Sequence, residues 1–312
     1  MMLYHNLHRN DITVSRLGLG TVQFGLDYGF TKAKNQDEVD SILDTCRDRG
    51  LTLLDTARAY GDSEEKIGRY LLHIKSNPFV IATKFDLITE DINAREDRLH
   101  FFLHRSIEKS LGALQVLDAL DLVLLHQAKD FIVQNPLFWR ILESLKKKNL
   151  IKSFGLSLYD VEQALSLVSD HADLIDFVQI PFSVFDQRFK EIFQIFERNQ
   201  IDVINRSVFL KGLIVCDPDD LPLELIDCRK FKQAFTDLAT ALNMSVAELA
   251  LGYVLQEDNL SASLVGVNSV DELLSNIKVF SLIDSIKQNS INFERFALEE
   301  SFLIDPRQWS QL

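Results

Sequence analysis

Residues 53–64 read LLDTARAYGDSE, and this stretch decides the fold of the chain. An apolar run ends abruptly at the carboxylate of Asp55, and Tyr60 follows five residues later. A helix pattern then begins at Asp62, with Glu65 three residues on as a capping-box signal. We therefore expect a buried strand, a short loop that holds Asp55 and Tyr60, and a helix.

Working outward, two further apolar runs end in a single polar or charged group. Residues 79–84 (FVIATK) end in Lys84, and residues 120–127 (LDLVLLHQ) carry His126 near their end. Polar groups at the carboxyl ends of parallel strands are where α/β folds place their chemistry. The sequence therefore predicts a catalytic set of Asp55, Tyr60, Lys84 and His126 at one rim.

That set makes chemical sense for proton transfer to a substrate oxygen. A tyrosine has a reference pKa of about 10, too high for efficient transfer near neutrality, and a nearby ammonium lowers it. Asp55 could hold Lys84 through a charge-assisted hydrogen bond, and His126 could orient the substrate oxygen. Each residue alone has a plainer explanation, such as a strand-end surface lysine or a core histidine; the conjunction of four favours a site.

The whole chain repeats the same strand-and-helix unit. Apolar β-type runs occur at residues 17–21, 51–55, 79–84, 120–127, 151–157, 177–180, 201–207 and 262–267, with helical patterns between them. Units of about 30 residues with near-continuous apolar strands predict an α/β fold, a single (β/α)₈ TIM barrel over residues 1–312. A short β-hairpin is expected in residues 2–16. A doubly wound open sheet is the alternative, although no G-x-G-x-x-G opens a helix after the first strand.

Composition excludes several classes of partner. The chain has 312 residues, is 46% hydrophobic and carries a net charge of −13. That balance argues against general nucleic-acid or anionic-membrane binding. Three cysteines without a C-x-x-C pair, no signal-peptide pattern and no run of about 18 apolar residues predict a cytoplasmic protein. The histidines outside the predicted site show no ligand spacing with Cys or Asp, so no metal site is expected.

The chain resembles the aldo-keto reductases in the strand ends described above and in several short motifs. The resemblance covers nearly the whole chain and is carried by residues 17–21 (LGLGT), 55–57 (DTA), 60–64 (YGDSE), 83–84 (TK), 125–126 (LH), 155–157 (GLS) and Gln179. It implies NAD(P)H-dependent reduction of an aldehyde or ketone at the carboxyl-end rim of a barrel. Tyr60 would be the general acid, Lys84 and Asp55 would tune its pKa, and His126 would orient the carbonyl.

The same resemblance implies a set of cofactor-binding residues, with two departures from the usual pattern. The set is Gly20, Thr21, Ser157, Gln179, Arg206, Ser207, Lys211, Gly212 and Asn276. Leu158 stands where an asparagine is common, and Arg206 stands where an aromatic ring commonly stacks on the nicotinamide. A guanidinium plane can also stack on a ring, but it adds a fixed positive charge.

The choice between the two nicotinamide cofactors depends on the segment after the last strand. NADPH-dependent members often place Arg and Lys there, whereas this chain has Glu272 at the usual arginine and no basic residue between Gly266 and Asn276. This weakens the preference for a 2′-phosphate. NADPH stays slightly favoured, with NADH as the alternative.

The substrate class is less defined by the sequence. Residues 21–29 (TVQFGLDYG) and 206–212 (RSVFLKG) resemble a bacterial subgroup often associated with surface polysaccharides, which suggests a sugar-like carbonyl compound. Arg206 suggests instead a substrate with a carboxylate or phosphate. Phe24, Phe182 and Phe209 fall near strand ends and could line an apolar substrate pocket.

Two other functions remain open at this stage. One is a cofactor-binding regulatory or interaction protein on the same fold, comparable with the potassium-channel β subunits. The departures at Leu158 and Arg206 from the usual cofactor residues favour this alternative. The other is a barrel enzyme of unrelated chemistry, such as a lyase or hydrolase, which would bind neither nicotinamide dinucleotide.

Overall fold

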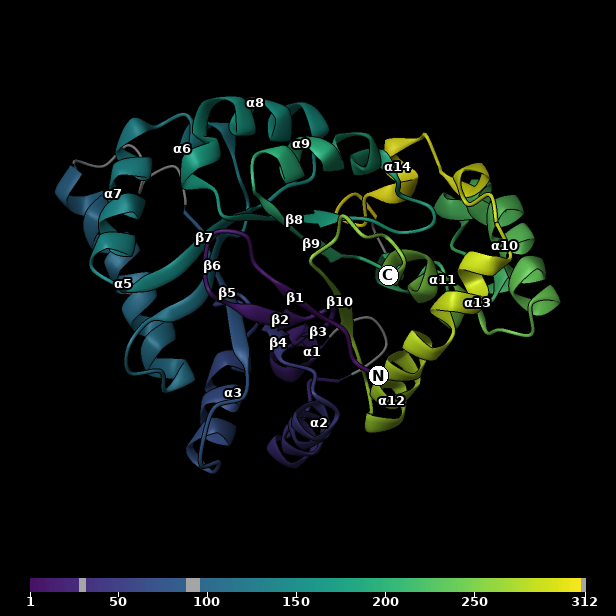
Figure 1. The fold of residues 1–312 in the computed structure, drawn as a ribbon, viewed down its shortest axis with the longest axis horizontal. Helices are drawn as coiled ribbons and strands as arrows, with labels where there is room; N and C mark the ends of the chain where they lie inside the picture. Colours follow the sequence, from purple (N-terminus) through teal and green to yellow (C-terminus); the bar gives the residue numbers. More distant parts are fainter. Residues whose placement is uncertain (28–31, 88–95, 310–312) are drawn as a thin grey trace.

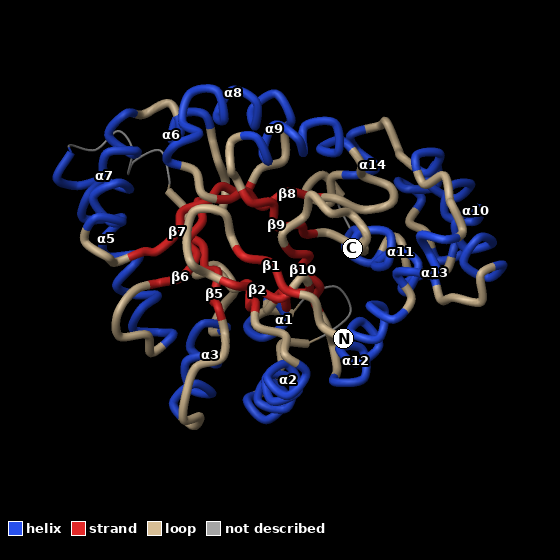
Figure 2. The backbone as a smooth tube through the Cα atoms, viewed as in Figure 1, coloured by secondary structure: helices blue, strands red, loops and turns tan. Residues whose placement is uncertain are grey.

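A closed barrel of parallel strands forms the centre of the molecule (Figures 1 and 2). The computed structural model describes residues 1–27, 32–87 and 96–309. The strands follow one another around the barrel in chain order, with β10 closing it against β3. They are β3 (Leu17–Gly20), β4 (Leu53–Asp55), β5 (Val80–Phe85), β6 (Leu120–Leu125), β7 (Ile151–Ser157), β8 (Phe177–Pro181), β9 (Asp202–Arg206) and β10 (Ala262–Gly266). The predicted (β/α)₈ barrel is confirmed, and closure excludes the open-sheet alternative.

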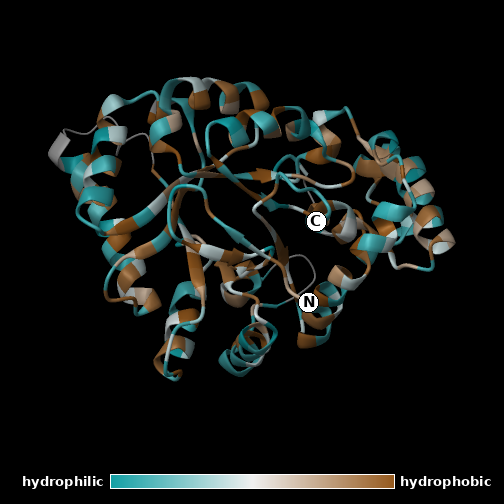
Figure 3. Ribbon diagram, viewed as in Figure 1, coloured by the Kyte–Doolittle hydropathy of each residue, from teal (hydrophilic) through white to brown (hydrophobic). Residues whose placement is uncertain are grey.

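Helices follow the strands and form the outer layer. They are α1 (Val22–Gly25), α2 (Gln36–Arg49), α3 (Ser63–Leu72), α5 (Glu96–Leu114), α6 (Asp130–Val133), α7 (Pro136–Lys147), α8 (Val161–His171), α9 (Phe193–Arg198), α10 (Arg229–Ala241), α11 (Val246–Leu255), α12 (Val270–Lys278), α13 (Ile283–Gln288) and α14 (Ser301–Ile304). Figure 3 shows hydrophobic and hydrophilic residues alternating along these helices, as expected of helices with one buried and one solvated face.

The predicted N-terminal hairpin is also present, and it closes one end of the barrel. Its strands β1 (Tyr4–Asn6) and β2 (Thr13–Ser15) pair antiparallel and lie across the barrel in Figure 1. Two hairpin side chains, Leu7 and Val14, are buried in one cluster with side chains of the barrel interior: Leu53, Ala82, Leu122, Leu124, Phe177, Ile204, Ala262 and Leu264. The hairpin therefore plugs the amino-terminal end of the strands and leaves the carboxyl-terminal rim for a site.

The start of α3 differs from its prediction. Asp62 is the N-cap residue, but its side chain makes no capping hydrogen bond, so the predicted capping box with Glu65 is wrong. The backbone of Asp62 (φ −98°, ψ 22°) is not in the extended conformation that capping requires. Its carboxylate instead lies 2.8 Å from Lys66 Nζ one turn further along the helix.

In the described part of the chain, no single helix is both long and apolar enough to cross a membrane. Only the pair Leu223–Ala241 and Val246–Leu255, bent by 92° at its break, satisfies both criteria, and it does so by length and composition alone.

Candidate active site

Neighbouring strands bring the four predicted catalytic residues to one rim. Asp55 is the last residue of β4, Lys84 lies near the end of β5, and His126 directly follows β6. Tyr60 lies in the loop between β4 and α3. Because β4, β5 and β6 are adjacent and parallel, their carboxyl ends share one edge of the barrel.

A buried ion pair forms the centre of the site. Lys84 Nζ donates to Asp55 Oδ2 at 2.6 Å and to the Thr56 carbonyl oxygen at 3.0 Å. The same ammonium lies 3.5 Å from the Tyr60 hydroxyl. Lys84 is 2% and Asp55 4% exposed, so water screens this pair little. The arrangement fixes a positive charge beside the phenol.

His126 completes the group from the other side of Tyr60. The two rings meet edge to face, with centroids 5.9 Å apart and planes at 81°. His126 Nδ1 lies 3.2 Å from Asp86 Oδ2, a carboxylate that the sequence analysis did not single out. When Nδ1 carries the ring proton of a neutral imidazole, it donates a hydrogen bond to Asp86, and Nε2 is the unprotonated nitrogen.

Burial and charge act in opposite directions on these groups. Burial is the largest single effect on the pKa of Lys84 and lowers it, but the charges and hydrogen bonds of Asp55 and Tyr60 together raise it more. The pKa therefore lies above its ordinary value and the ammonium is kept. Burial raises the pKa of Tyr60, and the Lys84 ammonium, which lowers it, does not offset the whole rise. A lowered pKa was predicted from the sequence; Lys84 acts in that direction, but burial has the larger effect on the pKa of Tyr60. Tyr60 is therefore a phenol at neutral pH.

The Tyr60 loop is held by close backbone approaches at two glycines and by a buried ion pair. A Cβ on Gly25 would overlap the Tyr60 carbonyl oxygen, and Gly61 (φ 58°) abuts the Gly25 carbonyl. Only glycine, which has no Cβ, allows the two backbones to approach this closely. Arg58 forms an ion pair with the buried Glu64, which also accepts a hydrogen bond from the Thr83 hydroxyl. Together they fix the loop against α1 and β5.

The first predicted cofactor residues lie around Asp55. Gly20 pairs in register with Asp55 at the end of β3. Thr21 is fully buried, and its hydroxyl donates to the Asp55 carbonyl oxygen at 3.0 Å. This hydrogen bond links the residue that follows β3 to the end of β4. Gln179 on β8 donates its amide to Asp55 Oδ1 at 2.7 Å, and Ser157 at the end of β7 lies beside it in register. Gln179 thus orients the carboxylate of Asp55, one of the predicted catalytic residues, a contact that no local sequence pattern indicated.

Arg206 and a C-terminal arginine lie on opposite sides of one tyrosine. The guanidinium carbon of Arg206 lies 3.8 Å from the centroid of the Tyr159 ring, and that of Arg307 lies 3.4 Å from the same centroid. Arg206 also donates to the Leu158 carbonyl at 3.0 Å, while its Nε is buried without a partner among the described residues. Arg206 is close enough to lower the pKa of Tyr60 slightly, and so it belongs to the same rim.

Three arginines, Arg188, Arg206 and Arg307, differ in whether a carboxylate forms an ion pair with them. Arg307 pairs with Asp305 through two hydrogen bonds of 2.8 and 2.6 Å, and Arg188 pairs with Asp186 through two of 2.9 and 2.8 Å. Within the described residues no carboxylate forms an ion pair with Arg206. Burial lowers its pKa, but from a value so high that the guanidinium stays charged. Arg206 is thus a cation available to a ligand.

The remaining predicted cofactor residues lie on two segments. Ser207, Lys211 and Gly212 follow β9 in a loop with unusual backbone, where φ is 63°, 53° and 95° respectively. Left-handed backbone at residues other than glycine is costly and is concentrated at functional loops. Asn276 lies on α12 and is largely buried. Within residues 1–27, 32–87 and 96–309, no hydrogen bond or ring contact joins the side chains of Ser207, Lys211 or Asn276 to the four predicted catalytic residues.

Two of the three predicted pocket phenylalanines belong to the core instead. Phe24 is 1% and Phe182 0% exposed. The Phe182 ring packs against Phe193 and Tyr253, with centroids 5.3 and 5.4 Å away, on the helical side of the barrel. A fully buried ring with such neighbours does not line an open pocket. Phe209 is half-buried and stays a candidate.

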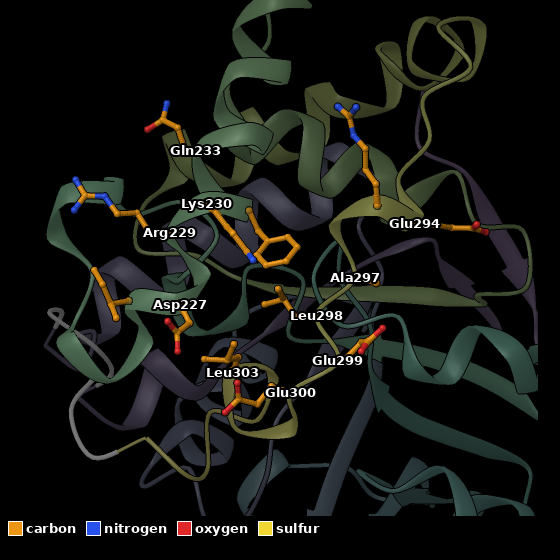
Figure 4. A pocket seen from close by; sticks show the side chains of 13 residues that line it. Asp227, Arg229, Lys230, Gln233, Glu294, Ala297, Leu298, Glu299, Glu300 and Leu303 are labelled. Carbon is orange, nitrogen blue, oxygen red and sulfur yellow. The ribbon is translucent and has the colours of Figure 1, made fainter.

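The protein also has a cleft that is lined by none of the four predicted catalytic residues (Figure 4). It is lined by residues of α10, among them Lys230 and Phe231, and by residues 294–303 of the C-terminal segment. Its charges are mixed, with Arg229 and Arg295 as well as Glu294 and Glu299 at its walls. None of the predicted catalytic or cofactor residues lines it, so it is not the catalytic site.

Comparison with known proteins identifies the family. The model of the aldo/keto reductase family matches residues 16–292. This chain belongs to the aldo/keto reductase family. The match spans the barrel from just before β3 to beyond α13 and includes all four predicted catalytic residues. As an aldo/keto reductase, the protein is an NAD(P)H-dependent carbonyl reductase by class.

Individual relatives are distant. The chain is 26% identical over 294 residues to the uncharacterized oxidoreductase YqkF of Bacillus subtilis, covering 89% of this chain and 90% of that protein. It is 24% identical to the NADH-specific methylglyoxal reductase of Escherichia coli over 88% of this chain and 93% of that one. Its fold is similar to the crystal structure of an aldo-keto reductase from Klebsiella pneumoniae in complex with NADPH, with a TM-score of 0.71 at 20% identity over 97% and 99% of the two chains.

The rim of this aldo/keto reductase suits a nicotinamide dinucleotide. Among the described residues, Arg206 Nε and Asn268 Oδ1 are buried without a hydrogen-bond partner. Asn268 follows β10 and Arg206 ends β9, so both lie at the carboxyl ends of strands. A ligand with amide, hydroxyl and phosphate groups offers partners to both atoms, which would otherwise be costly to bury. The residues present therefore fit the cofactor of the family.

Proposed function

We propose that this aldo/keto reductase reduces a small aldehyde or ketone carrying an anionic group, with Tyr60 as the general acid. The observation that carries the proposal is the Tyr60 hydroxyl 3.5 Å from an ammonium that is itself buried against Asp55. Of the four predicted residues, only Tyr60 combines a transferable proton at neutral pH with a fixed cation beside its oxygen. A regulatory protein without turnover has no need of such a pair.

Each residue has a defined task in the reaction. A bound nicotinamide cofactor supplies the hydride. Tyr60 gives its proton to the substrate oxygen as negative charge develops there, and Lys84 stabilises the phenolate that remains. Asp55 holds the ammonium in position and is itself oriented by Gln179. His126, with Nδ1 directed to Asp86, uses Nε2 to orient the substrate oxygen, donating a hydrogen bond when the ring carries both protons.

The anionic group is proposed from the unequal pairing of the arginines. Arg188 and Arg307 each hold a carboxylate of their own, whereas Arg206 has only the Leu158 carbonyl and an unpartnered Nε. Its stacking on Tyr159 fixes the guanidinium plane, which reduces the entropy lost when a carboxylate or phosphate binds. A carboxylate-bearing carbonyl compound would use this cation, and a sugar-like neutral one would not.

Two aldehydes of one carbon skeleton test the carbonyl-reducing activity and the preference for an anionic substrate. With NADPH or NADH, kcat/KM for 4-oxobutanoate is expected to exceed that for butanal by about tenfold or more, because a hydrogen bond to a charged group contributes about 1.5–3 kcal/mol. Arg206→Met should remove the difference, and Arg295→Met in the outer cleft should not. Equal values for the two aldehydes would refute the anionic substrate. Equal loss for both with weaker cofactor binding in Arg206→Met would assign Arg206 to the cofactor instead.

For the cofactor, NADPH stays the slightly favoured candidate and NADH the alternative, and the relatives differ in the same way. The E. coli relative is named NADH-specific, whereas the Klebsiella structure holds NADPH. In this chain Ser269 caps α12 and the Glu272 carboxylate accepts from the Asn268 backbone N–H at 2.7 Å. A helix N-terminus is a favourable anion site, and here a carboxylate already lies on it.

Glu272→Lys should therefore tighten NADPH binding selectively. Replacing a negative charge by a positive one beside a 2′-phosphate is worth on the order of 1–2 kcal/mol at a solvent-exposed site, or about tenfold in Kd. The Kd for NADH should hardly change. Fluorescence titration with both cofactors measures this, with Glu143→Lys on α7 as a control for net charge. An equal change for NADH and NADPH would show that α12 does not contact the 2′-phosphate.

A further inference from the structure

Two histidines and a carboxylate converge at the end of the barrel opposite the catalytic group. His5 lies on β1, His8 lies in the turn between β1 and β2, and Asp202 is the first residue of β9. His5 Nε2 and His8 Nδ1 each lie 3.0 Å from Asp202 Oδ1. The three ligand atoms lie within 4.8 Å of one another. Arg206, which belongs to the catalytic rim, ends the same strand that Asp202 begins.

The Asp202 carboxylate is fixed by hydrogen bonds to both of its oxygens. Asp202 is 2% exposed and accepts hydrogen bonds from the Ser261 hydroxyl at 2.7 Å and from the His8 backbone N–H at 2.7 Å. Among the described residues its ion-pair partners are His5 and His8, which are charged only when protonated. A buried carboxylate with two imidazole nitrogens 3.0 Å from one of its oxygens is an arrangement that can hold a cation.

We propose that His5, His8 and Asp202 bind a divalent transition-metal ion of the zinc class, through His5 Nε2, His8 Nδ1 and Asp202 Oδ1. Two imidazoles and one carboxylate are ligands that Zn²⁺ prefers. Tetrahedral bonds of about 2.0–2.1 Å separate neighbouring ligand atoms by about 3.3 Å, so the observed 3.0 Å separations need little adjustment. The ion would take the place of any proton on His5 Nε2 or His8 Nδ1, and that proton would be released to solvent.

The surroundings of these ligands are those of a metal site. Outer-shell partners normally orient metal ligands, and Ser261 and the His8 backbone N–H do so for Asp202. The other ring nitrogen of His8 lies 3.8 Å from Glu197 Oε1. The two imidazole side chains are 28% and 26% exposed, which leaves room for an entering ion and a water as fourth ligand.

The ion would join the hairpin plug to the barrel. Two ligands come from the hairpin and one from β9, and the turn is already held by Arg9, which donates to the carbonyls of Ala172 and Ile175 at 2.6 and 3.0 Å. The ligands are therefore preformed in the folded chain and separated in the unfolded one. Binding would stabilise the fold in proportion to ion concentration and leave the chemistry at the other end unaffected.

Titration of the untagged, chelator-treated protein with Zn²⁺ and Co²⁺ tests the site. Calorimetry should give one ion per chain, Tm should rise with added ion, and Co²⁺ should give the visible absorption of a bound complex. Ser261→Ala removes an outer-shell partner of Asp202 and should weaken ion binding by roughly 10- to 100-fold, the loss typical of such partners. His5→Ala and His8→Ala each remove a ligand and should weaken ion binding by at least as much. His73→Ala, which removes an exposed histidine after α3, should bind like the unchanged protein.

The remaining outcomes each overturn the proposal. If the unchanged protein binds neither ion, the three residues only form hydrogen bonds between the hairpin and the barrel. If the His5 and His8 variants bind as tightly as the unchanged protein, the ion lies elsewhere on the acidic surface. Should an alanine variant fail to fold, His5→Gln keeps a polar side chain on the hairpin and gives the same comparison, with carbonyl-reducing turnover as the check of folding.

Discussion

Tyr60→Phe is expected to lower kcat for carbonyl reduction by about 10²- to 10⁴-fold, the contribution of a positioned general acid. The substitution removes one oxygen and keeps the ring that meets His126 edge to face. It leaves the Lys84–Asp55 pair intact, because that pair holds itself together without the phenol. Initial rates with 4-oxobutanoate measure the loss, and fluorescence titration should show cofactor binding nearly unchanged.

A second tyrosine provides the control for this result. Tyr4→Phe removes a hydroxyl that donates to the Gly50 carbonyl on the hairpin side of the molecule, and it should leave turnover unaffected. If Tyr60→Phe kept full activity, Tyr60 would not be the proton donor and the proposed mechanism would be untenable. If it lost cofactor binding together with turnover, the phenol would have a binding role in addition to its chemical one.

The fold could be predicted well because its signals are local. Each strand is a short apolar run bounded by polar residues, and each polar terminus falls at the same end of a parallel strand. The cap of α3 was predicted wrongly because the rule reads residue types, whereas capping depends on backbone angles that the tight turn at Tyr60 imposes. That residues 1–312 form one domain, and that the protein is cytoplasmic without nucleic-acid or membrane partners, stay predictions.

The candidate site could be predicted only where strand ends define it. Asp55, Lys84 and His126 follow from three adjacent strands, but Arg307 reaches Tyr159 from the C-terminal segment, whose path depends on tertiary packing. Phe182 was misassigned because position near a strand end does not say which side of the barrel a ring faces. Two of the predicted bacterial-subgroup residues, Tyr28 and Gly29, lie outside the described residues.

The proposed metal cluster shows the same limit more clearly. His8 and Asp202 are separated by 194 residues, so no spacing rule connects them. The sequence-based expectation of no metal site rested on such rules alone. Only the docking of the hairpin onto the start of β9 brings the ligands together.

Lys84→Met should cause the largest loss of stability of any single change at the site. It leaves the Asp55 carboxylate buried without its cation, and breaking a buried pair in this way costs about 3–5 kcal/mol. The matched control is Lys152→Met on β7, whose ion pair with Asp121 is partly exposed and should contribute at most about 1 kcal/mol. Denaturant unfolding measures both.

The double variant Lys84→Met/Asp55→Asn separates stability from catalysis. Neutralising the carboxylate removes the uncompensated charge, and the asparagine oxygen can still accept the hydrogen bond from Gln179, so most of the lost stability should return. Turnover should not return, because the phenolate of Tyr60 then lacks the ammonium that offsets the effect of burial on its pKa. A double variant that regains kcat would show that Lys84 acts only as a counter-ion for Asp55. One that stays as unstable as Lys84→Met would show that the ammonium is needed for packing and not for charge.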